Sequence, residues 1–155
     1  MNALEDVKVH WVGYGNRKVS RQEKSKQIRK KIEPEKGFYY SISHTDRYSM
    51  AAVSEKYPVG IDIELQKRLE GKEEVLNTIF PRDCPLRPQE RWGVHEVLGK
   101  MEGTGLSEYY PIRELRQEEN NLYTVEYLKE NTARRAKIKI MNLSGYLLVL
   151  GCKKE

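Results

Sequence analysis

An α+β fold is predicted by three features of the sequence. Short segments rich in aromatic and β-branched residues indicate strands, and the clearest are 38–43, 48–54 and 59–64. Two longer segments, 20–32 and 89–101, carry helix signals. The strands and helices follow one another without the regular strand–helix–strand order of a parallel α/β protein. The chain has 155 residues, which suits one domain with a modest core.

The first 64 residues predict one helix among four strands. Ser20 and Glu23 have the spacing of a capping box, so we expect a helix that begins there, runs towards Ile32 and ends before Pro34. His44-Thr45-Asp46 is expected to form the turn between the second and third strands. The expected strands are Val7–Val12, Phe38–Ser43, Tyr48–Ser54 and Val59–Glu64.

The second part of the chain predicts two helices and then three strands. Apolar residues at 75, 76, 79 and 80 indicate a short helix that ends at Pro81. The clearest helix is Gln89–Met101, where Val94, Val97, Leu98 and Met101 form an apolar stripe at positions i, i+3, i+4 and i+7. The expected strands are Leu122–Leu128, Ala136–Ile140 and Tyr146–Leu150.

Positive charge is concentrated in one segment. The chain carries 28 basic and 23 acidic residues, a net charge of +5. The stretch Arg17–Lys36 alone holds nine basic and three acidic residues, so the rest of the chain is close to neutral. A basic element on a nearly neutral body indicates an anionic partner, such as phosphates, nucleic acid or an acidic protein. The alternative is a lysine-rich helix face that only contacts water.

Several classes of protein do not fit the sequence. The longest apolar run, Tyr146–Leu150, is too short to cross a bilayer, and residues 1–6 lack the pattern of a signal peptide. Cys84 and Cys152 stand alone, without metal-ligand spacing. We therefore expect a cytoplasmic protein with free thiols and no membrane contact. Nucleic-acid binding through the basic helix is a weak alternative, because no RNP, KH or zinc-finger pattern supports it.

The segment Val59-Gly60-Ile61-Asp62-Ile63-Glu64 places two carboxylates on one face of a strand. Residues two apart in a strand point the same way, so Asp62 and Glu64 lie side by side while Ile61 and Ile63 point into a core. Adjacent carboxylates repel unless a cation lies between them or one is protonated, and Mg²⁺ commonly takes one or two of them. The alternative is an edge strand whose acidic residues face water.

The helix at 89–101 carries a second group of polar residues. Trp92, Glu96 and Lys100 are spaced i, i+4 and i+8, so they are expected to lie together, opposite the apolar stripe. Glu96 would add a third carboxylate to a metal site, and Lys100 would meet a phosphate. The alternative is an ordinary surface pair of Glu and Lys. A zinc-protease HExxH motif is excluded, because Gly99 stands where the second histidine would be.

Ser43, His44 and Thr45 cluster at the end of a predicted strand, with donors suited to phosphate oxygens. The alternative is a histidine in a surface turn. Taken in order, Ser-Ile-Ser-His-Thr, Val-Gly-Ile-Asp-Ile-Glu and Trp-x-x-x-Glu-x-x-x-Lys followed by Gly-x-Gly-Leu form a pattern. This pattern resembles the three-part signature of 4′-phosphopantetheinyl transferases, in particular the type that activates surfactin synthetase. The resemblance covers Phe38 to Leu106.

The resemblance implies a fold of two pseudo-symmetric α+β lobes. The first lobe, residues 1–58, would be shortened and would carry the basic helix and the Ser-His motif. The second lobe, residues 59–155, would carry the Asp-x-Glu and Trp-x-x-x-Glu-x-x-x-Lys motifs. Because the first lobe is short, we expect a homo-oligomer in which a second chain covers part of the cleft.

The resemblance also implies an activity and a site. The protein would transfer the phosphopantetheine arm of coenzyme A to a serine of an acyl or peptidyl carrier protein and release 3′,5′-ADP, in a reaction that depends on Mg²⁺. Asp62, Glu64 and Glu96 would bind the metal, and Glu96 and Lys100 would be catalytic. The coenzyme A phosphates would contact six residues: Ser43, His44, Lys30, Lys31, Lys36 and Lys100. The alternative is an inactive relative that binds coenzyme A or a carrier protein without turnover.

Overall fold

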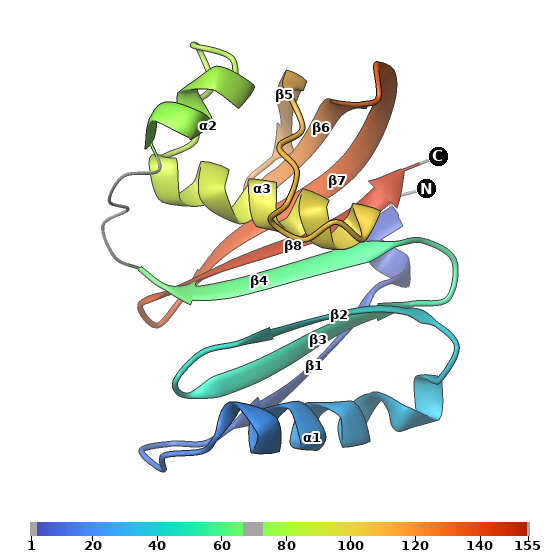
Figure 1. Cartoon of the computed structure of the whole chain (residues 1–155), viewed down its shortest axis with the longest axis vertical. Helices are drawn as coiled ribbons and strands as arrows, with labels where there is room; N and C mark the ends of the chain where they lie inside the picture. Colours follow the sequence, from blue (N-terminus) through green and yellow to red (C-terminus); the bar gives the residue numbers. More distant parts are fainter. Residues whose placement is uncertain (1–2, 67–72, 155) are drawn as a thin grey trace.

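The structure is a computed structural model that describes residues 3–66 and 73–154, and it has the predicted α+β class. Two antiparallel sheets are stacked between α1 on one side and α3 with α2 on the other (Figure 1). The strands are β1 (Lys8–Gly13), β2 (Tyr39–His44), β3 (Tyr48–Ser54), β4 (Val59–Leu65), β5 (Ile112–Glu119), β6 (Leu122–Lys129), β7 (Thr132–Leu143) and β8 (Tyr146–Lys154). The helices are α1 (Arg21–Ile32), α2 (Glu73–Ile79) and α3 (Pro88–Glu102), with 3₁₀ turns at Ala3–Asp6 and Glu33–Glu35.

The smaller sheet has the strand order β1-β3-β2 and is covered on one face by α1. The Ser20 hydroxyl accepts a hydrogen bond from the Glu23 amide, so the predicted cap at the start of α1 is present. The helix ends at Ile32, two residues before Pro34, as expected. Ile28 and Ile32 are buried against the α1-facing side of β3.

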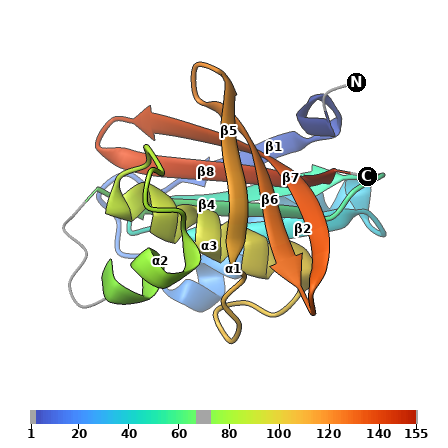
Figure 2. The same ribbon diagram turned by 90° about the horizontal axis from the view of Figure 1, so that it is seen from above.

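The larger sheet has the strand order β4-β8-β7-β6-β5 and packs against α3. Figure 2 shows that this sheet is strongly twisted, so β5 crosses the direction of β4. The apolar stripe of α3 (Val94, Val97, Leu98 and Met101) is buried on the sheet, as predicted. Gly60 lets β4 approach α3 closely, because a Cβ there would lie 2.5 Å from the Val97 carbonyl oxygen.

The two sheets share a connection pattern. In each, the first strand pairs with the last strand, and the last pairs with the one before it in the chain: β1-β3-β2 and β4-β8-β7. In each sheet, a helix that lies between the first and second strands in the chain packs on the first and last strands: α1 on β1 and β3, and α3, which comes after α2, on β4 and β8 (Figure 1). The larger sheet is extended by β5 and β6, and the chain passes from one sheet to the other between Ser54 and Val59.

The sheets meet along a seam between β2 and β4, which run parallel to each other. The main-chain amides of Ile61 and Ile63 each donate to a serine hydroxyl on β2, Ser41 and Ser43 respectively, at 3.0 Å. In a directly paired strand, these β4 amides would donate to main-chain carbonyls. Here the serine hydroxyls accept their hydrogen bonds instead. Beside the seam, the face of β3 that is turned away from α1 shares an apolar core with Ile61, Ile63 and β8.

Most predicted elements are present, and the differences have physical causes. Strand β5 was not predicted, because it is an exposed edge strand in which Ile112 is the buried residue and the others are mainly charged or polar. Strand β7 extends beyond the predicted Ala136–Ile140 because both of its ends belong to hairpins. The described helices include none that is both long and apolar enough to cross a membrane.

Trp92 corrects one prediction about α3. It was expected to lie with Glu96 and Lys100, away from the buried stripe, but it is 5% exposed and belongs to the core. The helix is buried on more than one side, because α2 and the segment after α3 also cover it. His95, next to Trp92 on this side, is buried and stacks on Tyr109. A helix covered on several sides has a wider apolar arc than one stripe.

Candidate functional site

A cleft of about 590 Å³ opens where β2, β4, α3 and the start of α1 come together. Its volume is in the range of small-molecule sites. We call Asp62, Glu64 and Glu96 the acidic wall of the cleft, and Arg21, Lys24, His44 and Lys100 its basic wall. The residues that line the cleft are Arg21, Lys24, Ile42, Ser43, His44, Thr45, Asp46, Asp62, Ile63, Glu64, Glu96, Lys100 and Leu106.

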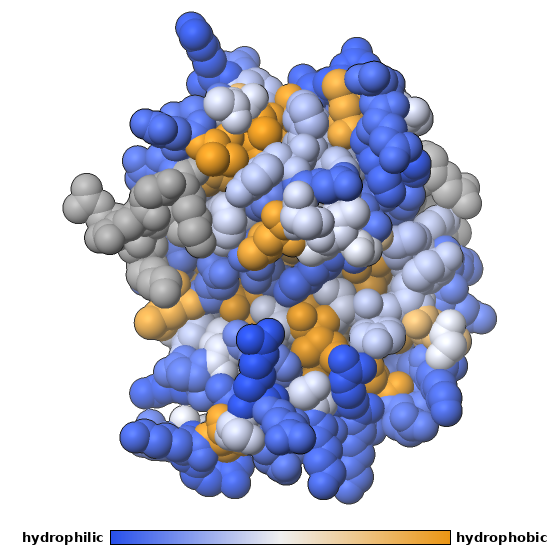
Figure 3. All heavy atoms as spheres, in the orientation of Figure 1, coloured by the Kyte–Doolittle hydropathy of each residue, from blue (hydrophilic) through white to orange (hydrophobic). Residues whose placement is uncertain are grey.

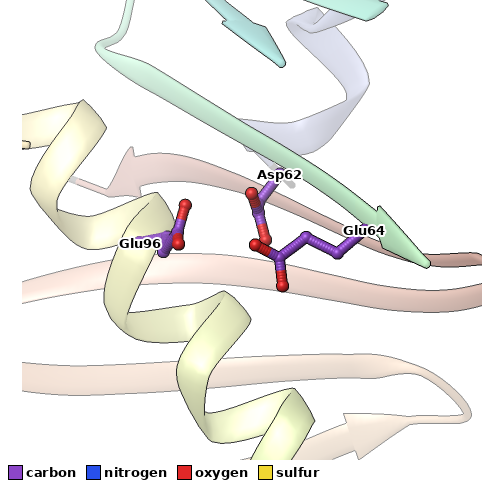
Figure 4. Close-up of side chains that lie close together, drawn as sticks. All are labelled: Asp62, Glu64 and Glu96. Carbon is purple, nitrogen blue, oxygen red and sulfur yellow. The ribbon is translucent and has the colours of Figure 1, made fainter. Parts of the chain in front are cut away.

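The acidic wall consists of the three predicted carboxylates. Asp62 and Glu64 project from the same face of β4, and Glu96 reaches them from α3 (Figure 4). One oxygen atom from each of the three lies within 4.8 Å of the others. The opposite face of β4 carries Ile61 and Ile63 in the core, as predicted. The predicted convergence of Asp62 and Glu96 is therefore confirmed.

Asp62 does not behave as a surface acid. It is 4% exposed, and its Oδ2 lies beside Gly93, 3.8 Å from where a Cβ of that residue would be. Burial, followed by the charges of Glu96 and Glu64, raises the pKa of Asp62 well above its usual range. The ionised cluster thus needs a compensating positive charge. Three hard oxygen donors around a small space fit Mg²⁺, whose remaining positions water and phosphate oxygens would fill.

The basic wall combines α1, β2 and α3. Arg21 and Lys24 come from the first turn of α1, His44 ends β2, and Lys100 lies on α3. Burial, followed by the charges of Arg21, Lys24 and Lys100, lowers the pKa of His44 below its usual value. The cationic groups are therefore close enough to act together on an anion in the cleft.

Lys100 also connects the two sheets. Its Nζ donates to the main-chain carbonyl of Ile61 at 2.6 Å and to that of Ile42 at 3.2 Å. An ammonium group has three donors, so two are used at the seam and one remains for a ligand. Lys100 thus lines the cleft and holds β4 beside β2.

Ser43 and His44 both line the cleft, as expected. The Ser43 hydroxyl accepts the Ile63 amide and is 7% exposed, so its oxygen has a structural partner and its proton is available for a donor bond. The ring of His44 contacts Ser49 through Nδ1, at 2.7 Å from the hydroxyl oxygen. The other ring nitrogen is the one available to a ligand.

The structure does not bring Lys30, Lys31 and Lys36 into the residues that line this cleft. Lys31 lies beside β1, in a groove with Trp11, and Lys36 lies in a hollow with Arg29 and Tyr40. A helix rises 1.5 Å per residue, so Lys30 is about 13 Å along α1 from Arg21. On the face shown in Figure 3, most side chains in the lower region, where α1 lies, are hydrophilic.

Arg21 and Lys24 take the place at the cleft that was predicted for the later lysines. One signal in the sequence pointed to Lys24: it lies four residues before Ile28, on the helix face that packs on the sheet. Lys24 Nζ donates to the Thr45 carbonyl at 2.5 Å, so it is held against the turn after β2. The position of the α1 N-terminus over that turn is a tertiary feature, which the sequence does not reveal.

No protein-family model matches this chain, and no curated protein is detectably similar to it.

Proposed function

We propose that this protein transfers the 4′-phosphopantetheine arm of coenzyme A to a serine of an acyl or peptidyl carrier protein. One observation carries the proposal: a single cleft is lined by three clustered carboxylates (Asp62, Glu64 and Glu96), by the basic side chains of Arg21, Lys24 and Lys100, and by the ring of His44. Such a cleft suits a substrate that brings both phosphates and a metal. In the reaction, the serine oxygen forms a bond to the phosphorus next to the pantetheine arm. The pyrophosphate P–O bond breaks, and 3′,5′-ADP leaves.

The proposed fold is that of the transferases, with residues 1–58 as a shortened first lobe and 59–155 as the second. The matching strand order of the two sheets, and the matching places of α1 and α3, support this proposal. The cleft lies where the two lobes meet, beside the β2–β4 seam.

Asp62, Glu64 and Glu96 would hold Mg²⁺. Bound there, the ion would neutralise negative charge on the pyrophosphate. Glu96 is half-buried at the edge of the cleft, and we assign it the uptake of the proton from the attacking serine. This proton becomes easier to remove as the serine oxygen forms its new bond.

The basic wall would bind and orient the phosphates. Arg21 and Lys24 supply charge, His44 supplies a ring donor, and the third N–H of Lys100 supplies another. Phosphoryl transfer is accelerated mainly by positioning and by the cancellation of charge, and these residues provide both. Lys30, Lys31 and Lys36 lie outside the cleft, where we assign them to an acidic carrier protein rather than to coenzyme A.

A second candidate is a relative that binds coenzyme A without turnover. Lys100 favours it, because two of the three Nζ donors are engaged with Ile42 and Ile61. In that case the lysine would be mainly a structural connection between the sheets.

The experiment is incubation with coenzyme A, Mg²⁺ and a panel of apo carrier proteins, read by intact mass. Transfer predicts a mass increase of one phosphopantetheine arm on a carrier protein. Calorimetric binding of coenzyme A without any mass increase supports the second candidate. Absence of coenzyme A binding contradicts both.

A further inference from the structure

A buried hydrogen-bond chain lies behind His44. The Tyr14 hydroxyl is 2.6 Å from the Ser49 hydroxyl oxygen, which is 2.7 Å from His44 Nδ1. Ser49 is 0% exposed and Tyr14 is 2% exposed, so water does not compete for these bonds. The chain ends at the cleft, because His44 is one of the residues that line it.

The backbone holds the three residues together. His44 and Ser49 are opposite each other in the β2–β3 hairpin. Tyr14 follows β1, and its main-chain amide donates to the Arg47 carbonyl at 2.8 Å. The order of these residues along the chain, with Tyr14 far from Ser49, gives no indication of the contact.

Two arrangements of protons are consistent with the distances for a neutral ring. In the first, Tyr14 donates to Ser49, Ser49 donates to Nδ1, and the ring proton is on Nε2. In the second, Nδ1 donates to Ser49, Ser49 donates to Tyr14, and Tyr14 donates to the Lys24 carbonyl. That last bond is 3.4 Å long, and the carbonyl lies inside α1, where it is already an acceptor within the helix. Both arrangements keep the two short bonds, but the first needs no long one.

The charges around His44 disfavour a third arrangement, with protons on both ring nitrogens. Burial lowers the pKa of His44, and the charges of Arg21, Lys24, Lys100 and Arg29 lower it further. The ring is therefore neutral near pH 7, and the proton of a neutral ring goes to the nitrogen that the neighbouring hydrogen bonds select.

We infer that Ser49 and Tyr14 are positioning residues, which keep the His44 proton on Nε2 and so present an N–H donor to an anion bound in the cleft. The inference rests on the proposed function only for the identity of that anion, a phosphate of coenzyme A. A fixed neutral donor orients an oxygen without adding to the charge already supplied by Arg21 and Lys24.

The decisive measurement is ¹⁵N NMR of the histidine rings in the full-length wild-type protein. The inference expects a pyrrole-like Nε2 and an imine-like Nδ1 for His44 at neutral pH. The reverse assignment in the wild-type protein would overturn it, whatever the variants do. This measurement needs no ligand and no activity, so the proposed function can fail without affecting the result.

Two variants test the role of the chain. Ser49→Ala removes the partner of Nδ1, so the ring should become a mixture of both tautomers. Tyr14→Phe keeps the Ser49 hydroxyl but removes the tyrosine hydroxyl that donates to it. The Ser49 proton is then less strongly directed to His44 Nδ1, so we expect a smaller shift of the His44 ¹⁵N resonances in the same direction. Ser54→Ala is the matched control: it lies on the same strand, is 1% exposed, and its hydroxyl accepts the amides of Lys56 and Tyr57 in the β3–β4 turn. An unchanged His44 spectrum in both Ser49→Ala and Tyr14→Phe contradicts the inference.

Inorganic pyrophosphate serves as the probe for the anion. Its addition should shift the Nε2–H resonance of His44 in the wild-type protein. Ser49→Ala should bind it about twofold more weakly, because only the rings that carry the proton on Nε2 can donate to the anion. Ser54→Ala should bind it as the wild type does. If pyrophosphate leaves Nε2 of His44 unaffected, the assignment of this donor to an anion is wrong.

Discussion

The carboxylates of Asp62 and Glu96 meet across the contact between β4 and α3, with Glu64 completing the group. β4 can approach α3 this closely because Gly60 lies at their interface, where an added Cβ would clash with the Val97 carbonyl oxygen. Gly93 in turn lets α3 approach β8, where an added Cβ would clash with Val149. The packing of α3 on the larger sheet, which buries the apolar stripe of the helix, therefore also brings like charges together.

Glu96→Gln should separate catalysis from folding. The substitution keeps the side-chain shape but removes a metal ligand and the group assigned to take up the serine proton, so the transfer rate should fall by about a hundredfold or more. Without metal, the melting temperature should stay the same or rise, because one source of repulsion on Asp62 is removed. Glu119→Gln, on the exposed edge strand β5, is the control for loss of an acidic charge. Unfolding of Glu96→Gln would show that the residue is structural.

Stability should fall as pH rises in the absence of Mg²⁺ and should depend much less on pH in its presence. Because the folded-state pKa of Asp62 is raised, the metal-free native state binds one more proton than the unfolded state, and its stability falls as pH rises above the usual carboxyl range. Mg²⁺ replaces that proton, so it should raise the melting temperature more at pH 8 than at pH 6, by at least about 3 °C, which corresponds to about 1 kcal/mol here. In Asp62→Asn the pH dependence should be reduced. Equal Mg²⁺ effects at the two pH values would contradict the proposed site.

Gly99→Ala should be destabilising although alanine favours helices. A Cβ at this position would lie 1.9 Å from the Gly105 carbonyl oxygen, and the amides of Thr104 and Gly105 donate to the Gly99 carbonyl. We expect a loss of about 2–3 kcal/mol in the free energy of unfolding, measured with denaturant. Gln22→Ala, on the exposed side of α1, should be neutral or slightly stabilising. A stabilised Gly99→Ala would mean that the segment after α3 does not pack as described.

Charge reversal should distinguish two parts of α1. Arg21→Glu should weaken binding of coenzyme A because the residue lines the cleft, and the effect should be larger at low salt. Lys30→Glu combined with Lys31→Glu should leave coenzyme A binding nearly unchanged and raise the KM for an acidic carrier protein. The Arg21→Glu variant and the combined Lys30→Glu and Lys31→Glu variant are thus controls for each other. A larger loss of coenzyme A affinity in the Lys30/Lys31 variant would restore those lysines to the nucleotide site.

Loss of the seam serines should cost stability. Ser41→Ala leaves the buried amide of Ile61 without its side-chain acceptor, and Ser43→Ala does the same for Ile63. Each should lower the free energy of unfolding by about 1–3 kcal/mol in denaturant titrations. Thr132→Ala, on an exposed end of β7, is a suitable reference. If Ser41→Ala and Ser43→Ala are both as stable as Thr132→Ala, water replaces the serine hydroxyls as acceptor for the β4 amides.

Much of the architecture could be predicted, since it depends on local patterns. Ser20 and Pro34 mark the ends of α1, and the spacing of Val94, Val97, Leu98 and Met101 defines a helix face. Strand β5 could not be predicted, because an edge strand needs no apolar alternation. The burial of Trp92 was predicted wrongly, since it depends on which elements cover α3 and not on the helix alone. The expected homo-oligomer, carrier protein and cellular location stay predictions.

The sequence by itself determined that Asp62 and Glu64 share one face of a strand and that Glu96 and Lys100 share one face of a helix, because backbone geometry sets these relations within a few residues. Only the tertiary structure decided that the two pairs meet, that Lys100 bonds to the carbonyls of Ile42 and Ile61, and that Arg21 rather than Lys30 lines the cleft. The reason is physical. Contacts between elements depend on which surfaces can approach one another, and the glycines and serines that permit the approach carry no charge or periodicity that marks them in the sequence.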